Sequence, residues 1–176
     1  MTPRRLVVVG ASLAGLRAVE GARRDGFAGT VTLIGAEEHL PYNRPPLSKA
    51  CLEAGPGEVP DTTFRNEHTL RAELGVDLRL GAPAAGLDTE ARAVRVNGAP
   101  VPYDALVIAT GAAARTMPGT EGVTGVHSLR TADDAAAVRR ALDDRARLVV
   151  VGAGFIGSEV ASAARRRSHA TGIDCS

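Results

Sequence analysis

Short apolar runs that end in glycine are the clearest pattern along the chain. Residues 6–9 (LVVV) are apolar and mostly β-branched, they end at Gly10, and an alanine-rich stretch with helical periodicity follows. A continuous apolar run of this length is typical of a strand that is buried on both faces of a parallel sheet. The pattern predicts a strand over 6–9, a helix over 13–24 and a buried strand over 30–34, together a βαβ unit of about 30 residues.

The same pattern returns further along the chain. Residues 148–151 are a second apolar run that ends at Gly152, and residues 155–167 again have helical periodicity. The spacing between the two copies is too long for a solenoid repeat, so they indicate two nucleotide-binding openings. We assign 1–115 to a first domain and 116–176 to the beginning of a second one.

Further elements are expected between the two copies. A proline-rich loop over 37–60 should hold one short helix, because proline suits the first turn of a helix. The pattern then predicts helices over 47–53 and 66–74, strands over 76–80 and 105–109, and a linker over 111–125. A hairpin is expected over 92–101, with its turn at Asn97-Gly98. Thr131 and Asp134 form a capping box, which should open a helix that ends at about Asp143. The strands over 4–9, 30–35, 76–80 and 105–109 should share one mainly parallel sheet, with 148–151 in a separate sheet.

Gly152, Gly154 and Gly157 have the spacing of a dinucleotide-binding turn. The first glycine permits the tight turn, the second lets the backbone approach a pyrophosphate, and the third lets the helix pack closely on the strand. The start of the helix then offers free N–H groups and a positive dipole to the phosphates. The alternative is an ordinary βα turn that needs small residues, but the strand–helix context favours nucleotide binding.

The first copy departs from this spacing at one position. Ser12 stands where the middle glycine would be, between Gly10 and Gly15; its hydroxyl could donate to a phosphate, although it hinders close approach of the backbone. About 20 residues on, Glu37 and Glu38 follow the second strand, where an acidic side chain can bind the ribose hydroxyls of an adenosine. Glu37 has the better position; the alternative is a solvated acidic loop.

The predicted fold class is α/β: a Rossmann-like domain with a parallel sheet and a β-meander, plus the start of a second Rossmann-like domain.

Composition narrows the possible partners. The net charge is +1, aromatic residues make up 3% and tryptophan is absent, so we expect neither a nucleic-acid partner nor a membrane surface. No apolar run is long enough to cross a bilayer, and no secretory signal is present. Cys51 and Cys175 form neither a CxxC motif nor a disulfide framework, which indicates a reducing, cytoplasmic setting. Cys51 is expected to be a small core residue, and no metal site is predicted.

Four segments carry a more specific signal. They are PYNRPPLSK at 41–49, YDALVIATG at 103–111, LRT at 129–131 and GAGFIGSE at 152–159. In this order they resemble the FAD-dependent ferredoxin reductases, the family of the putidaredoxin- and rubredoxin-type reductases within the pyridine nucleotide-disulfide oxidoreductase superfamily. The resemblance extends over residues 5–167.

The resemblance implies FAD at the first turn and NAD(P)H at the second. The residues implied for FAD are Gly10, Ser12, Leu13, Ala14, Gly15, Glu37, Arg44, Lys49, Ala84, Ala109, Thr110, Gly111 and Arg130. Those implied for NAD(P)H are Gly152, Gly154, Phe155, Ile156 and Gly157.

It also implies an activity. In this family the flavin accepts a hydride from NAD(P)H and passes electrons singly to a ferredoxin or a rubredoxin-type acceptor. Lys49, the only lysine of the chain, and Glu159 are implied to form a catalytic ion pair beside the flavin. The pair would clasp the two nucleotide-binding units together and leave Phe155 to cover the nicotinamide. The alternative is a surface lysine and a solvent-facing glutamate.

The chain is shorter than such a reductase. We expect an N-terminal fragment that lacks the rest of the nicotinamide domain, the aspartate that binds the ribityl chain, and the C-terminal domain. The segment 168–176 has no strand pattern, which suggests a truncation or a frameshift. Such a fragment should bind FAD weakly and reduce no acceptor. Two alternatives stay open: a non-catalytic nucleotide-binding module or truncated pseudogene product, and a flavin monooxygenase, which explains the PPLSK segment less well. The electron acceptor, the choice of NADH or NADPH and the oligomeric state are left open.

Overall fold

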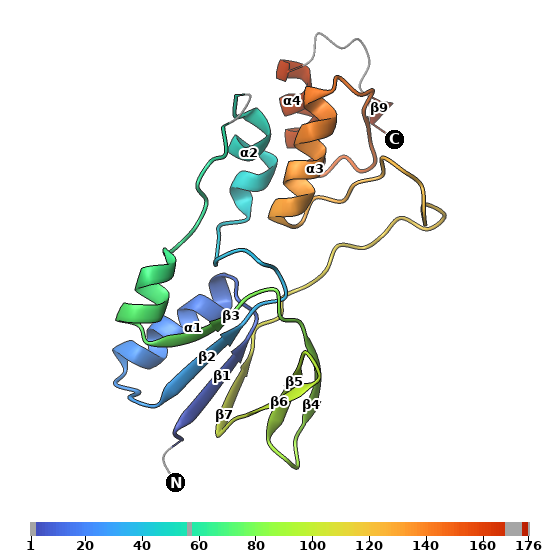
Figure 1. Ribbon diagram of the computed structural model, residues 1–176. Helices are drawn as coiled ribbons and strands as arrows, with labels where there is room; N and C mark the ends of the chain where they lie inside the picture. Colours follow the sequence, from blue (N-terminus) through green and yellow to red (C-terminus); the bar gives the residue numbers. More distant parts are fainter. Residues whose placement is uncertain (1–2, 56–57, 168–173, 176) are drawn as a thin grey trace. The chain divides into compact units, whose positions relative to one another are not determined.

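The structure, a computed structural model, describes residues 3–55, 58–167 and 174–175 (Figure 1). They divide into two compact units. The first unit holds the described residues up to Asn43 and those from Thr63 to Ala112; the second holds those from Arg44 to Thr62 and those after Ala112. Each unit is described by itself.

Four parallel strands form the main sheet of the first unit. They lie in the order β3-β2-β1-β7, with the bounds β1 (Arg5–Val9), β2 (Thr30–Ile34), β3 (Val76–Arg79) and β7 (Ala105–Ile108). Helix α1 (Leu13–Arg24) connects β1 to β2. The prediction that these four segments share one parallel sheet is confirmed.

Alternate residues of β1 enter two different cores, which explains why the whole run is apolar. Leu6 and Val8 pack with Leu16 and Val19 of α1. Val7 and Val9 pack on the opposite side with apolar residues of an antiparallel meander, which is formed by β4 (Ala84–Asp88), β5 (Ala93–Val96) and β6 (Ala99–Pro102). A strand covered on both faces has no solvent side that would favour a polar residue.

Some elements of the first unit differ from their sequence-based expectation. Strand β4 was not expected, because all five of its residues are exposed and a register shift between Ala84 and Gly86 interrupts the alternation. The helix expected over 66–74 contains a π-helical turn, η2 (Thr69–Glu73), which closes when the Leu74 N–H donates to the Thr69 carbonyl at 2.9 Å.

The second unit is mainly helical and has a small sheet of its own. Its elements are η1 (Pro45–Ser48), α2 (Ala50–Glu53), α3 (Ala132–Asp143), β8 (Val149–Val150), α4 (Phe155–Arg167) and β9 (Asp174–Cys175). The separate sheet expected at 148–151 is confirmed, because β8 pairs in parallel with β9 and with no strand of the first unit. The expectation of no strand in 168–176 is wrong for Asp174–Cys175; a two-residue strand is specified by its pairing partner and leaves no pattern of its own.

The segment 44–62 packs within the second unit, although the sequence analysis placed it inside the first domain. Leu52 of α2 is fully buried in one core with Val138 of α3 and Val160 of α4. The single helix expected over 47–53 is divided into η1 and α2, because the backbone at Lys49 (φ −117°, ψ −104°) is not helical.

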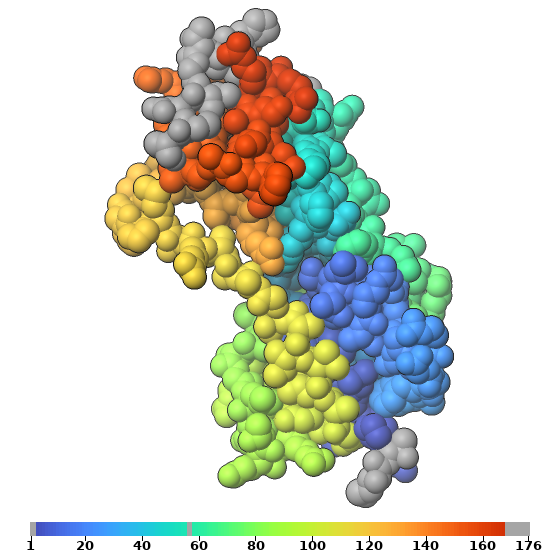
Figure 2. Space-filling model, turned by 180° about the vertical axis from the view of Figure 1, so that it is seen from behind, coloured from blue at the N-terminus to red at the C-terminus, as the bar shows by residue number. Residues whose placement is uncertain are grey.

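The start of α3 has the predicted capping box. The Asp134 N–H donates to the Thr131 hydroxyl at 3.1 Å, and the Asp134 carboxylate accepts from the Thr131 N–H at 2.9 Å. The preceding segment from Gly111 to Gly119 is exposed at every residue and is drawn in yellow on the surface in Figure 2. None of the helices in the described residues is both long and apolar enough to cross a membrane.

Candidate functional site

The first glycine turn is fixed by two close backbone contacts. Gly10 has φ +114°, and a Cβ atom at this position would lie 2.0 Å from the carbonyl oxygen of Ala109. A Cβ at Gly15 would lie 1.8 Å from the carbonyl oxygen of Gly10. Both contacts are far closer than real Cβ atoms allow, so β1, the turn and α1 can meet only with glycine at these two positions.

The start of α1 is suited to an anion. Ser12 is the N-cap in extended conformation, its hydroxyl makes no capping hydrogen bond within the described chain, and the first turn contains no acidic residue. The first N–H groups and the positive end of the helix dipole therefore lack an anionic side chain of their own. A phosphate group fits this end of the helix, with Leu13 and Ala14 as the first helical residues.

Three of the predicted FAD segments meet at one edge of the first sheet. The Gly10 N–H donates to the Ile34 carbonyl at 2.8 Å, and the Ala109 N–H donates to the Val9 carbonyl at 2.7 Å. Because β1, β2 and β7 are parallel neighbours, the residues after each strand lie at the same edge. This edge brings together the turn 10–15, the segment 35–37, and the segment 109–111 with Gly111 at φ +69°.

Glu37, the predicted ribose ligand, is held by a partner that the sequence analysis missed. The hydroxyl of Tyr42 donates to Glu37 Oε2 at 2.5 Å, and Tyr42 itself is buried. The Glu37 carbonyl accepts from the Gly81 N–H at 2.9 Å. Ala84, the first residue of β4, follows Gly81 by three residues. The only available signal for Tyr42 was its place in the PYNRPPLSK segment.

In the second turn the three glycines differ in what surrounds them. Gly152 has φ +108°, and a Cβ at Gly157 would lie 2.2 Å from the Gly152 carbonyl oxygen. A Cβ at Gly154 would have no described atom of another segment within 4 Å. The fold thus requires glycine at the first and third positions, whereas the open space at Gly154 is where a pyrophosphate would approach the backbone. Phe155 beside it is 91% exposed.

Lys49 and Glu159 form the ion pair that the sequence predicts. Lys49 Nζ lies 2.8 Å from Glu159 Oε1, and the hydroxyl of Ser48 donates to Oε2 of the same carboxylate. The hydrogen bond from Lys49, followed by that from Ser48, holds the pKa of Glu159 below its usual range. The buried Ser48 was not among the predicted site residues. Glu159 is therefore an anion at neutral pH with two donors on it.

Both partners of this pair lie in the second unit. The expectation that the pair clasps the two units together is therefore wrong, because the segment that carries Lys49 packs on α3 and α4. Arg44 and Arg130 also belong to this unit, where the Arg44 guanidinium donates to the Arg130 carbonyl at 2.5 Å.

Cys51 is only partly buried and is not the core residue that was expected. Burial raises the pKa of its thiol, so the reactive thiolate is disfavoured at neutral pH. Across the ranges that the structure covers, no three His, Cys, Asp or Glu side chains are grouped so that they could hold a metal ion.

A comparison with known families decides the relationship. The family model described as pyridine nucleotide-disulphide oxidoreductase matches residues 4–175. The chain belongs to this family. Among similar family members is rhodocoxin reductase of Rhodococcus erythropolis, which is 38% identical over 168 residues. The ferredoxin–NAD(+) reductase component of the p-cumate 2,3-dioxygenase system of Pseudomonas putida is 40% identical over 166 residues.

The fold agrees with solved structures of reductases. The covalent complex of putidaredoxin reductase with putidaredoxin aligns with a TM-score of 0.87 at 33% identity, over 98% of this chain and 42% of that chain. The two reductases named above align over 92% of this chain but over only 38% and 40% of their own lengths. The chain thus spans about two fifths of the relatives that it matches.

Proposed function

We propose that this chain is the N-terminal part of an FAD-dependent oxidoreductase that passes electrons from NAD(P)H through the flavin to a ferredoxin or a rubredoxin-type acceptor. The observation that carries the proposal is the presence of two glycine turns of the same construction, one in each unit. Two such turns serve two dinucleotides. The matched relatives named as ferredoxin–NAD(+) reductase components support this pairing of cofactors.

The first unit is proposed to bind the adenosine diphosphate end of FAD. The N–H groups at the start of α1 would hold the pyrophosphate, and the Ser12 hydroxyl would donate to it. Glu37 would accept from the ribose hydroxyls while Tyr42 keeps its carboxylate in place. The backbone of Ala84 would lie along the adenine, and Ala109, Thr110 and Gly111 would line the pyrophosphate. When bound, the flavin accepts a hydride and releases electrons one at a time.

The second unit is proposed to bind the nicotinamide nucleotide and to supply the charged pair. The backbone at Gly152, Gly154 and Gly157 would hold its pyrophosphate. Phe155 and Ile156 lie at the mouth of the turn with large exposed apolar surfaces, which suit the planar face of a nicotinamide. Arg44 and Arg130 would bind the flavin cofactor from this unit.

Lys49 and Glu159 are proposed as the catalytic pair. A compact ammonium held by a carboxylate would present positive charge and N–H donors to a bound flavin. Glu159 orients the Lys49 ammonium, and Ser48 occupies the second carboxylate oxygen so that the pair has one geometry.

The test is a fluorescence titration of the purified 176-residue chain with FAD and with NADH, followed by an assay of electron transfer to a ferredoxin. We expect weak FAD binding and no reduction of the acceptor, because the chain spans only about two fifths of its relatives. Glu37→Gln should weaken FAD binding and leave NADH binding unchanged. Binding of neither nucleotide would favour a non-catalytic module, and turnover by the isolated chain would contradict the proposed incompleteness.

A further inference from the structure

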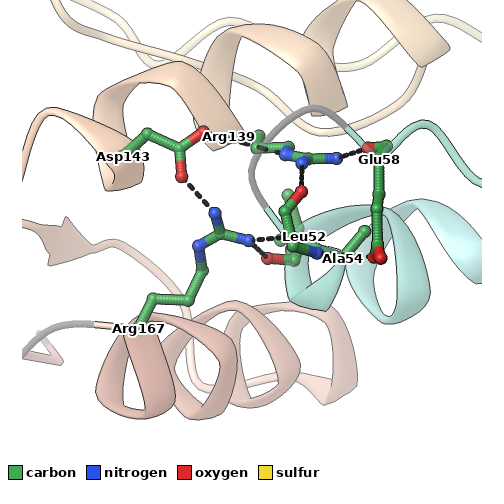
Figure 3. Close-up of polar contacts among 7 residues, drawn as sticks. Leu52, Ala54, Glu58, Arg139, Asp143 and Arg167 are labelled. Carbon is green, nitrogen blue, oxygen red and sulfur yellow. Dashed lines mark hydrogen bonds and ion pairs between the residues drawn. The ribbon is translucent and has the colours of Figure 1, made fainter.

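Two arginines of the second unit point into the backbone of the segment that carries Lys49 (Figure 3). Arg139 comes from α3 and Arg167 from α4, and each side chain is only 14% exposed. Arginine side chains are seldom this well covered unless their N–H groups are paired. The acceptors they use are carbonyl oxygens of the chain at and just beyond α2.

Each guanidinium binds two carbonyls. Arg139 donates to the carbonyl oxygens of Gly55 and Glu58. Arg167 Nη1 donates to the carbonyl of Leu52 at 2.8 Å and to that of Ala54 at 2.6 Å. The carbonyls at the end of a helix have no partner within the helix, and cations are favoured there by the helix dipole. Arg167 therefore binds the carbonyls at the end of α2, and Arg139 binds the chain just beyond it.

Asp143 joins the two arginines. Its carboxylate contacts Arg167 Nη2 through Oδ1 and lies 3.8 Å from Arg139 Nε through Oδ2. Asp143 is the last residue of α3, a position where the helix dipole disfavours negative charge. Two guanidinium partners reverse that preference, so Asp143 serves this cluster rather than its own helix.

The cluster of Arg139, Arg167 and Asp143 is connected to the pair of Lys49 and Glu159 through α2. The N–H groups of Leu52 and Glu53 both donate to the Lys49 carbonyl at 2.9 Å, so α2 is a single turn with Lys49 as its N-cap. One isolated turn is unstable in water, so its position is set by what it packs against. Besides the buried Leu52 side chain, the carbonyl contacts of Arg139 and Arg167 hold this turn.

We propose that Arg139 and Arg167, joined by Asp143, are positioning residues that hold the α2 turn against α3 and α4 and thereby keep Ser48 and Lys49 on Glu159. They touch neither cofactor nor substrate in this role. The inference rests on the proposed function only for the catalytic role of Lys49 and Glu159. The effect of the arginines on the geometry of that pair depends on the described second unit alone.

The test follows the titration of Glu159 by ¹³C NMR in the 176-residue chain labelled at glutamate carboxyls, with Glu159→Gln to assign the signal. Arg167→Met should move the pKa of Glu159 upward toward the ordinary glutamate value of about 4.3, since Lys49 and Ser48 are no longer held on it. Lys49→Met should also raise the pKa of Glu159, because it removes the larger of the two hydrogen-bond contributions. Arg165→Met, an exposed arginine two residues earlier that makes none of these contacts, should leave the titration unchanged.

The conservative variant separates positioning from charge. Arg167→Lys keeps the positive charge beside Asp143 but cannot reach two carbonyls and the carboxylate with one planar group, so we expect an intermediate shift. If Arg167→Met does not fold, the pKa of Glu159 is compared between the wild type and the variants Arg167→Lys and Asp143→Asn instead.

Three results would overturn the proposal. One is a stable Arg167→Met protein in which Glu159 titrates as in the wild type, which would make Arg167 a structural residue only. Another is the wild-type titration in a folded Arg167→Lys or Asp143→Asn protein. The third is an unchanged Glu159 signal in Lys49→Met. No nucleotide is added in this experiment, so a failure of the proposed FAD binding does not affect it.

The sign of the pH effect follows from the lowered pKa of Glu159. A carboxyl whose pKa is lower in the folded state stabilises the fold fully above its ordinary pKa and loses that contribution as the pH falls through the folded value. The Arg167→Met protein should therefore show a smaller loss of stability on acidification, over the range from about pH 4.3 downward, than the wild type.

Discussion

A methyl group added at Gly157 would lie 2.2 Å from the Gly152 carbonyl oxygen, whereas one added at Gly154 would meet no described atom of another segment within 4 Å. The two glycines are three positions apart in one turn, yet only Gly157 is required by the packing of the fold. Among the described residues, no contact requires a glycine at position 154. The role that we propose for it is to let a phosphate approach the backbone.

We expect opposite outcomes for two substitutions in this turn. Gly157→Ala should lower the free energy of unfolding by about 1–3 kcal/mol, since the added Cβ overlaps backbone. Gly154→Ala should change stability by less than about 0.5 kcal/mol but weaken NADH binding. Urea unfolding and an NADH fluorescence titration measure the two effects. Equal stability loss in both variants, or NADH binding untouched by Gly154→Ala, would argue against a phosphate site at this turn.

Single residues also show which parts of the site could be predicted from sequence. The glycine spacing and Glu37 follow from the physical needs of a dinucleotide turn, and Lys49 with Glu159 followed only from the family resemblance. Ser48 and Tyr42 were missed as partners, because a hydroxyl that orients a carboxylate leaves no periodic signal. Arg139 and Arg167 were missed for a related reason: their acceptors are backbone carbonyls, which every residue has.

Among the secondary-structure elements, those with a strong hydrophobic pattern were predicted well. Strand β1 is buried on both faces and α1 on one, and both have the expected bounds within one residue. Strand β4 is exposed and carries a register shift, and β9 has two residues, so neither had a pattern to detect. The segment 44–62 was placed in the first domain because of its position in the chain, whereas in the structure its Leu52 packs with α3 and α4.

Leu52→Ala tests that assignment. Leu52 is fully buried, so its truncation should cost about 2–5 kcal/mol in the stability of the second unit. Hydrogen exchange should accelerate at amides of α3 and α4 and stay unchanged in β1. Val59→Ala, an exposed apolar residue of the same segment, is the matched control and should change neither. Faster exchange in β1 with α3 and α4 unaffected would mean that this segment packs in the first unit.

At the scale of the whole molecule, each compact unit carries one strand–turn–helix opening and its own hydrophobic core. The first unit adds Glu37 and the segment 109–111 at the edge of its sheet, and the second adds the pair of Lys49 and Glu159. The chain belongs to the pyridine nucleotide-disulphide oxidoreductases and spans about two fifths of the matched relatives' length. The central claim that these observations support is that the glycine turn of the first unit binds FAD and that of the second unit binds NAD(P)H.

The most direct test is an amide NMR map of the ¹⁵N-labelled chain titrated with FAD and, separately, with NADH. FAD should shift amides at the start of α1, near Glu37 and over 109–111. NADH should shift those over 152–157. With Gly154→Ala, the second set of shifts should need a higher NADH concentration, and the first set should be unchanged. If both nucleotides shift the same set of amides, or if neither shifts the amides of the glycine turns, the assignment of one dinucleotide to each glycine turn is wrong.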